Sequence, residues 1–172
     1  MLIKILLVCC FFNLVMAGEL TLCEYSSVVE GCKNKQITKV EIPADVTYIA
    51  DMAFSGCKWL SVASFPESLQ RIGYKAFFEI GLEKLLITGN LTKLGDRSFE
   101  GCTKLKEVVI VSELLAIPND CFKGCLQLKE VGLPMSLKSI GSNAFEECSS
   151  LKEIVLPNLL ERIGYVSCAA IS

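Results

Sequence analysis

A phenylalanine returns at an almost constant interval through most of the chain. Phe54, Phe77, Phe99, Phe122 and Phe145 are spaced 23, 22, 23 and 23 residues apart. The same frame recurs around each of them, and its clearest copy reads L-x-x-I-G-x-x-A-F-x-x-C-x-x-L-x-x-I-x-L-P from Leu137 to Pro157. The single spacing of 22 reflects one residue missing between Ile80 and Leu82. Because each unit is too short to bury its own apolar face, this period predicts units that stack and share one core.

Each unit divides into an extended half and a compact half. In "LKEIVLP" the alternation around Ile154 predicts a short strand with one buried side, and Pro157 ends it because proline cannot donate to a ladder. In "IGSNAFEEC" the apolar residues lie at helical spacing, which predicts a turn at Gly141 followed by a short helical or 3-10 segment. The expected core consists of Ile140, Phe145, Leu151, Ile154 and Leu156 with their equivalents in the other units.

The frame resembles that of the BspA-type leucine-rich repeat family, whose units carry the I-G-x-x-A-F-x-x-C-x-x-L-x-x-I-x-L-P signature. The resemblance covers residues 37–172 and implies an α/β-type repeat solenoid, a stack of short parallel strands joined by turns or short helical segments. The chain departs from the signature at Ile80, Cys121 and Cys168, and its last unit is incomplete. Members of the family resemble surface and secreted proteins linked with adhesion to host proteins. The resemblance therefore implies an interaction module.

The first residues read as a secretory signal peptide. Lys4 precedes an apolar run, and the small residue Ala17 marks a cleavage site, so we expect residues 1–17 to be removed. The alternative is a short membrane anchor, but a bilayer core needs about 20 apolar residues and this run is shorter and interrupted by Asn13. We expect a secreted or surface-exposed chain with an N-terminal cap at 18–36 and the repeats at 37–172.

The cysteines fall into two groups. Cys57, Cys102, Cys125 and Cys148 occupy equivalent positions, so their side chains should stack in parallel, which suits neither a disulfide nor a tetrahedral metal site. We expect this column to stay reduced and to pack as small apolar residues. Cys23 and Cys32 lie outside the repeat register and are expected to form a disulfide that fixes the cap, with two unpaired thiols as the alternative.

Composition argues against most catalytic and nucleic-acid functions. The 172 residues contain no histidine, which removes the commonest general base and the commonest zinc ligand. The net charge is −2, with no basic run that would indicate a nucleic-acid surface. We therefore expect neither an enzyme nor a bound metal or cofactor, and no membrane span once the signal peptide is removed.

The surface most suited to binding is the outward side of the predicted strands. Two positions per unit face solvent there. The candidate binding residues at these positions are Lys39, Glu41, Val62, Ser64, Lys84, Leu86, Glu107, Val109, Glu130, Glu153 and Val155. The second position in the unit of Glu130 is Gly132. Glutamates at the same position of three consecutive units, beside apolar residues, predict a face that binds a protein or a glycan. The alternative is an ordinary solvated face, with the glutamates balanced by Lys106, Lys129 and Lys152.

Two further features stay open at this stage. Asn90-Leu91-Thr92 is an acceptor triplet for N-glycosylation, which matters only in a eukaryotic source. The last segment, "LERIGYVSCAAIS", begins another unit but contains no complete strand motif. A second hypothesis is therefore a structural protein or a truncated copy of a larger repeat adhesin, which associates end to end through this edge.

Overall fold

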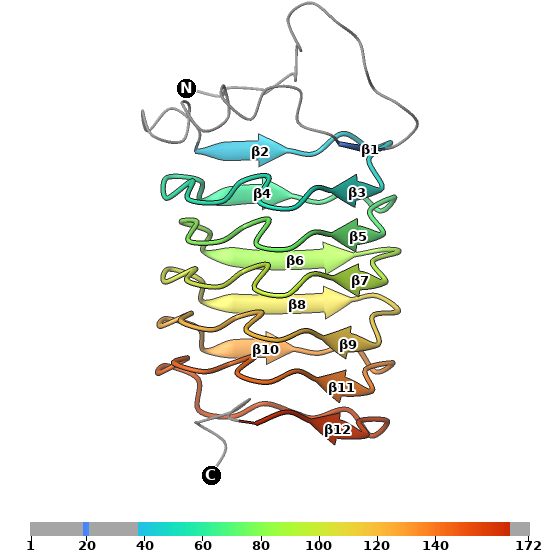
Figure 1. The fold of residues 1–172 in the computed structure, drawn as a ribbon, viewed down its shortest axis with the longest axis vertical. Coiled ribbons are helices and arrows are strands. Elements are labelled where there is room, and N and C mark those ends of the chain that lie inside the picture. The colour runs from blue at the N-terminus through green and yellow to red at the C-terminus, as the bar shows by residue number, and fades with distance from the viewer. Residues whose placement is uncertain (1–18, 21–37, 166–172) are drawn as a thin grey trace, which may run out of the picture.

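The strands of the molecule form two parallel ladders along the length of the stack, and the hydrogen-bonded pairing of each ladder is interrupted once (Figure 1). The computed structural model describes residues 19–20 and 38–165, so the predicted signal peptide and the Cys23–Cys32 pair lie outside the described residues. One side of the stack carries β2 (Lys39–Glu41), β4 (Val62–Ser64), β6 (Lys84–Thr88), β8 (Glu107–Val111) and β10 (Glu130–Gly132). The other carries β1 (Glu19–Leu20), β3 (Tyr48–Ile49), β5 (Arg71–Ile72), β7 (Lys93–Leu94), β9 (Ala116–Ile117), β11 (Ser139–Ile140) and β12 (Arg162–Ile163).

The first ladder follows the sequence frame, and proline sets the length of its strands. Most units place proline just after the strand, as Pro134 does, and β10 accordingly ends after three residues. In two other units the position of Pro134 is occupied by Thr88 and Val111, which have the backbone N–H group that proline lacks. As a result β6 and β8 extend to five residues and pair with each other along their whole length.

The core is the predicted column of apolar residues, one layer per unit. Strand residues such as Leu85 and Val108 point inward and are buried, while their neighbours point outward. The phenylalanine rings stack face to face with centroids 5.2, 5.2, 5.6 and 5.5 Å apart from Phe54 to Phe145. Of the expected core of the last full unit, Leu156 alone is half-buried. This arrangement confirms a stack of parallel strands about 23 residues apart.

The compact half of each unit is a series of turns, so the predicted short helical segment is wrong. No helix occurs within the described residues. Each unit instead places two residues four apart at positive φ, for example Asn143 (φ 57°) and Glu147 (φ 61°) in one unit and Asp120 (φ 53°) and Gly124 (φ 73°) in the previous one. A left-handed residue interrupts a right-handed helix, so the chain reverses direction here without forming a helical turn.

The second ladder was not predicted from the sequence. The L-x-x-I-G motif was read only as a turn, but its two residues before glycine form strands that pair in register, such as Ser139–Ile140 with Ala116–Ile117. Conversely, the segment 152–156 was expected to be a strand and is not one. The last described strand, β12, belongs to the second ladder and pairs with β11.

The cysteine column has a structural role in most units. The Cys102, Cys125 and Cys148 thiols are buried, and they donate hydrogen bonds to the Phe77, Phe99 and Phe122 carbonyl oxygens at 3.2, 3.4 and 3.2 Å. Burial raises the pKa of the Cys102 thiol to about 12, so this thiol is protonated and unreactive at neutral pH. These three cysteines are free, as predicted.

Cys57 differs from the rest of the column. It takes part in a disulfide bond, and its partner is not among the described cysteines, since the other four are free. The prediction that the whole column stays reduced is therefore wrong at this residue. Cys57 belongs to the first full unit, so its sulfur lies at the N-terminal end of the column.

Candidate functional site

The strand face is the outward surface of β2, β4, β6, β8, β10 and the segment 152–156. The register confirms that the predicted residues form rows across the strands: Lys84, Glu107 and Glu130 lie opposite one another in one row, and Leu86, Val109 and Gly132 lie opposite one another in the next. Lys39 and Glu41 lie opposite Val62 and Ser64 in the same way. Glu153 and Val155 are exposed in the following unit.

The charges of this face are balanced at one end and not at the other. The Lys39 ammonium lies 2.7 Å from the Glu41 carboxylate, and the Lys84 ammonium lies 2.7 Å from the Glu107 carboxylate, which raises the pKa of Lys84. Glu130 lies directly opposite Glu107, an arrangement of like charges that destabilises a sheet. Neither Glu130 nor Glu153 makes an ion pair within the described residues.

The lysines that were expected to balance this row do not do so. The Lys106 ammonium binds the Glu83 carboxylate at 3.0 Å, which lowers the pKa of Glu83. Lys129 and Lys152 are exposed and make no ion pair with any residue of the described part. From β8 onward, Glu130 and Glu153 therefore carry charges that no ion pair among the described residues balances.

Apolar side chains lie in the row beside these carboxylates. Leu86 is 58% exposed and Val155 is 82% exposed, and Val111 at the end of β8 is 61% exposed. Gly132 lies opposite Val109 in this row, and a Cβ built on it would meet its neighbours no closer than 3.8 Å. Neither the space nor a positive φ demands glycine here, and Val109 beside Gly132 is half-buried.

The ladder of the strand face is interrupted between β4 and β6. No pairing joins these two strands, whereas β2 pairs with β4 and β6 pairs with β8. The interruption occurs at the unit that lacks one residue, and a hollow of roughly 530 Å³ lined by Val62, Lys84 and Leu86 lies there. The ladder on the other side of the stack is also interrupted, between β7 and β9, although the 23-residue spacing is kept there, so a missing residue does not account for both interruptions.

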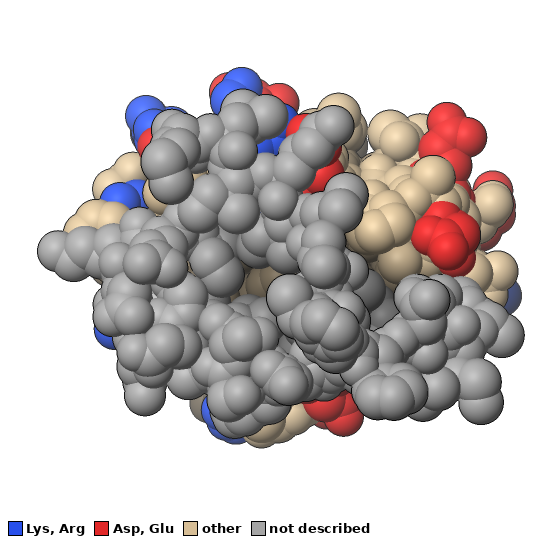
Figure 2. Space-filling view, turned by 90° about the horizontal axis from the view of Figure 1, so that it is seen from above, with Lys and Arg blue, Asp and Glu red and all other residues tan. Residues whose placement is uncertain are grey.

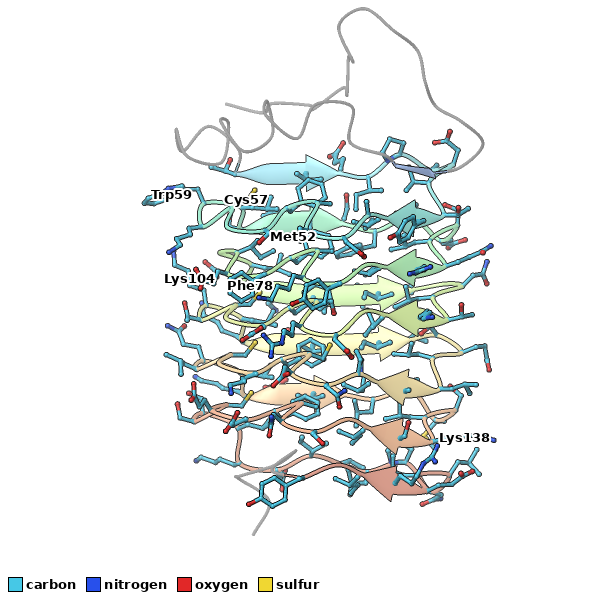
Figure 3. All side chains as sticks on the ribbon, in the orientation of Figure 1. Met52, Cys57, Trp59, Phe78, Lys104 and Lys138 are labelled. Atoms are coloured by element: carbon cyan, nitrogen blue, oxygen red, sulfur yellow. The ribbon has the colours of Figure 1, made fainter. Side chains whose placement is uncertain are left out.

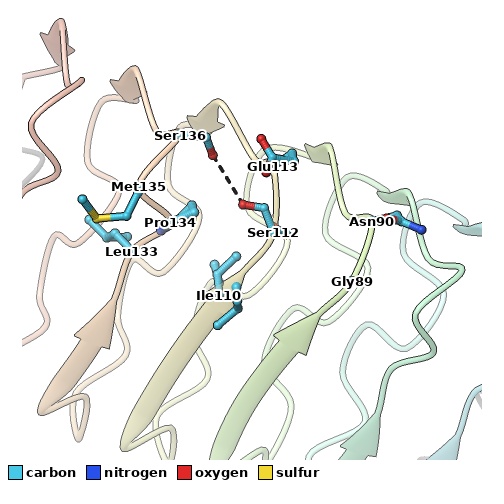
Figure 4. A pocket seen from close by; sticks show the side chains of 10 residues that line it. Gly89, Asn90, Ile110, Ser112, Glu113, Leu133, Pro134, Met135 and Ser136 are labelled. Carbon is cyan, nitrogen blue, oxygen red and sulfur yellow. Dashed lines mark hydrogen bonds between the residues drawn. The ribbon is translucent and has the colours of Figure 1, made fainter.

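A second hollow lies where the strands of this face end (Figure 4). It measures roughly 490 Å³ and exists because β8 continues to Val111 while Pro134 stops β10 at Gly132. The Ser136 hydroxyl donates to the Ser112 carbonyl oxygen at 3.4 Å across its upper side. The exposed residue Asn90 lies at the edge opposite Met135.

Viewed down the stack, charged side chains lie mainly on separate edges (Figure 2): acidic residues gather at the right of the picture and most lysine and arginine residues at the left. Within residues 38–165, no three cysteine, aspartate or glutamate side chains gather in a way that could hold a metal ion. The described part of the chain also contains no helix that could cross a bilayer. The main chemical property of the strand face is a mixed acidic and apolar surface.

Known structures share this fold. A leucine-rich repeat protein from Eubacterium ventriosum superposes with a TM-score of 0.61 at 24% identity over 74% of this chain. The T. pallidum leucine-rich repeat protein TpLRR superposes with a TM-score of 0.52 at 25% identity over 67% of it. The matched parts span 41% and 65% of those two chains. Among curated proteins, no sequence matches this chain.

The sequence profile of the BspA type leucine-rich repeat region matches residues 30–135 and 115–170, in 6 copies. The matched ranges include every described strand except β1, together with the phenylalanine stack and the cysteine column. This match and the parallel-strand stack lead to the same conclusion: the chain belongs to the BspA-type leucine-rich repeat family.

Proposed function

We propose that this chain is a secreted or cell-surface interaction module that binds a protein through the acidic end of its strand face. The supporting observation is that Glu130 lies opposite Glu107 in register and that neither Glu130 nor Glu153 makes an ion pair with a described residue. Glu107 is paired with Lys84, whose ammonium also attracts Glu130, so the row from Lys84 to Glu153 carries three carboxylates and one ammonium. A partner that supplies cations complements the carboxylates that remain.

The neighbouring apolar row indicates the kind of partner. Leu86, Val109, Val111 and Val155 form a strip beside the carboxylates, and Gly132 leaves a shallow gap in it. A protein surface with an apolar side chain flanked by lysine or arginine complements both rows. A glycan offers less apolar area and matches the strip less well, so we favour a protein over a glycan on this face.

The test compares matched variants in the capture of proteins from an extracellular-matrix extract. Gly132→Thr fills the gap and raises strand propensity, so the fold should persist while binding is lost. Glu130→Gln with Glu153→Gln removes two charges from the face, and Asp45→Asn with Glu67→Gln removes two charges from turns outside it. We expect a retained protein to be lost with the first two variants and kept with the third.

The captured protein is then purified and its dissociation constant is measured at two salt concentrations. The charge-removal variant should weaken binding at low salt more than at high salt, since salt screens exposed charges. Proteins retained equally by wild type and by both face variants would refute the proposal.

A second candidate function is self-association through the C-terminal end of the stack. β12 pairs with β11 alone within the described part, and on this edge Ile163 is 49% exposed and Tyr165 is 83% exposed. A second copy of the chain could extend the ladder there. Light scattering over a concentration series should show growth that Ile163→Lys abolishes, and a strict monomer whose last unit resists hydrogen exchange like the central ones would contradict this.

Asn90 is proposed as a glycosylation site in a eukaryotic source. Its side chain is exposed at the edge of the hollow after β6, and its backbone N–H donates to the Glu67 carbonyl oxygen at 3.2 Å. Expression in eukaryotic cells should give a protein whose mass falls on treatment with a glycosidase, and Asn90→Gln should abolish the difference. An unmodified Asn90 under these conditions would contradict the proposal.

A further inference from the structure

The unit that lacks one residue leaves a notch on the edge of the stack. In the preceding unit the segment from Cys57 to the buried Leu60 contains Lys58 and Trp59, and in the shortened unit only Gly81 separates Ile80 from Leu82. Ile80 and Leu82 are buried in the same columns as their equivalents. Both core columns are thus preserved, and the missing residue is one of the two exposed positions that Lys58 and Trp59 occupy in the preceding unit.

The notch is not filled by the shortened segment itself. A Cβ built on Gly81 would lie 2.3 Å from the Lys58 carbonyl oxygen, so no side chain fits at this position. The result is a hollow of roughly 430 Å³ lined by Lys58, Trp59, Glu79, Gly81, Thr103 and Lys104. This volume lies within the range of small-molecule sites, about 300–1,000 Å³.

Trp59 and Lys104 occupy equivalent positions in the units on either side of the notch. Their units are two layers apart in a parallel stack, which corresponds to about 10 Å, and the shortened unit lies between them. Both side chains project from the same edge of the stack (Figure 3). Trp59 is the only tryptophan of the chain, and it is 44% exposed.

One positive charge is in excess around the notch, and the Lys106 ammonium, together with the charge of Lys104, lowers the pKa of Glu83. The Lys58 ammonium lies 3.4 Å from the Glu79 carboxylate, and Glu83 is bound by Lys106. Lys104 makes no ion pair with any residue in the described ranges. The hollow therefore combines an aromatic side chain, a hydroxyl group from Thr103 and one excess positive charge.

We propose that this notch binds a sugar residue that carries a carboxylate, such as a uronic acid or a sialic acid. A sugar ring has an apolar C–H face that can stack on the Trp59 indole, and its hydroxyl groups can reach the Thr103 hydroxyl and the Glu79 carboxylate at the rim. Its carboxylate complements Lys104. The site lies at the turns before β4, β6 and β8, and it does not depend on the partner proposed for the strand face.

The experiment uses the emission of Trp59, which reports on the notch directly because the chain has no other tryptophan. The probes are D-glucuronate and N-acetylneuraminate, with D-glucose as the neutral control and an acetylated Asp-Pro-Gly peptide as a non-sugar anion. We expect a saturable emission change with an acidic sugar and at least about tenfold weaker binding of glucose, since the charged contact is absent. Lys104→Gln should reduce the affinity for the acidic sugar to that for glucose.

Three further variants separate the notch from nonspecific effects. Lys129→Gln removes an equally exposed lysine elsewhere and should leave binding unchanged. Insertion of serine after Gly81 restores the 23-residue spacing and should abolish binding, and Trp59→Leu should abolish it in saturation-transfer NMR. Thermal melts identify any variant that is unfolded. If the insertion variant fails to fold, the affinity of Lys104→Gln for the acidic sugars still tests the proposal, because this substitution lies on the surface.

The proposal is overturned if neither acidic sugar gives a saturable change or if glucose binds as tightly as they do. Tighter binding of the peptide than of the acidic sugars would also overturn it, because the notch would then be a site for acidic peptide segments. Equal losses with Lys104→Gln and Lys129→Gln would show that nonspecific charge attraction causes the signal.

Discussion

Replacement of Phe122 by alanine should be among the most destabilising single changes in this molecule. The Phe122 ring is fully buried and stacks on two neighbours, Phe99 at 5.6 Å and Phe145 at 5.5 Å between centroids. Removing a buried phenylalanine side chain costs about 3–5 kcal/mol through lost transfer energy and the cavity left behind. Each stacked pair adds about 0.5–1.5 kcal/mol beyond the buried area.

Phe145 provides a matched comparison because it has one stacking partner among the described residues. We expect Phe122→Ala to cost about 4–5 kcal/mol and Phe145→Ala about 1 kcal/mol less, the difference being one ring contact. Tyr165→Ala removes an aromatic side chain that is exposed and should cost less than about 0.5 kcal/mol.

The assay is equilibrium unfolding in urea, followed by circular dichroism and by Trp59 emission. Coincident transitions for the two signals would show that the stack unfolds as one unit, which allows the free energies to be compared. A cost below about 1 kcal/mol for Phe122→Ala, or a larger cost for Phe145→Ala, would refute the reasoning that each ring stabilises the layers on both of its sides.

Three other predictions concern the turns and the cysteines. Glu147 holds φ at 61°, so Glu147→Gly should raise the unfolding free energy by about 0.5–1 kcal/mol in the same urea assay, and a decrease would show that its carboxylate stabilises the turn. Burial raises the pKa of the Cys102 and Cys121 thiols from 9.0 to about 12, so their contribution to stability should be constant below pH 9 and be lost as the pH rises from 9 toward 12, a range in which these two thiols ionise only in the unfolded chain. A double alanine variant should show a shallower fall, and an unchanged slope would rule out these thiols as its cause. Mass mapping of non-reduced peptides should join Cys57 to a cysteine outside residues 38–165, and alkylation of Cys57 in the native protein would contradict this assignment.

Much of the architecture follows from equivalent positions in the sequence. The spacing of phenylalanine identifies one core residue per layer, and all five are buried in one stack. The alternation within each strand separates Leu85 from Leu86, and the proline after a strand marks where β10 ends. These properties can be read from the chain because they depend on local geometry and on a period that repeats it.

The rows of the strand face also follow from the period, since equivalent residues must lie opposite one another. The pairing of their charges does not. Lys106 binds Glu83 in the preceding unit and leaves Glu107 to Lys84, a choice that depends on where each side chain lies in three dimensions. The sequence pattern alone therefore does not tell which lysine pairs with which glutamate, and the contacts between units decide it.

The turns and the second ladder were decided by tertiary structure. Local spacing in "IGSNAFEEC" favours a helix, but hydrogen bonds from one unit to the next hold this segment open, as when the Phe122 N–H donates to the Ala144 carbonyl oxygen at 2.9 Å. A helix would direct these groups along its own axis. The two-residue strands of the second ladder are too short to show a period, and they exist because stacking places each beside its equivalent. The sequence by itself determined which residues form each layer, and the stacking of the layers decided the backbone conformation between them, because the hydrogen bonds that select it join different units.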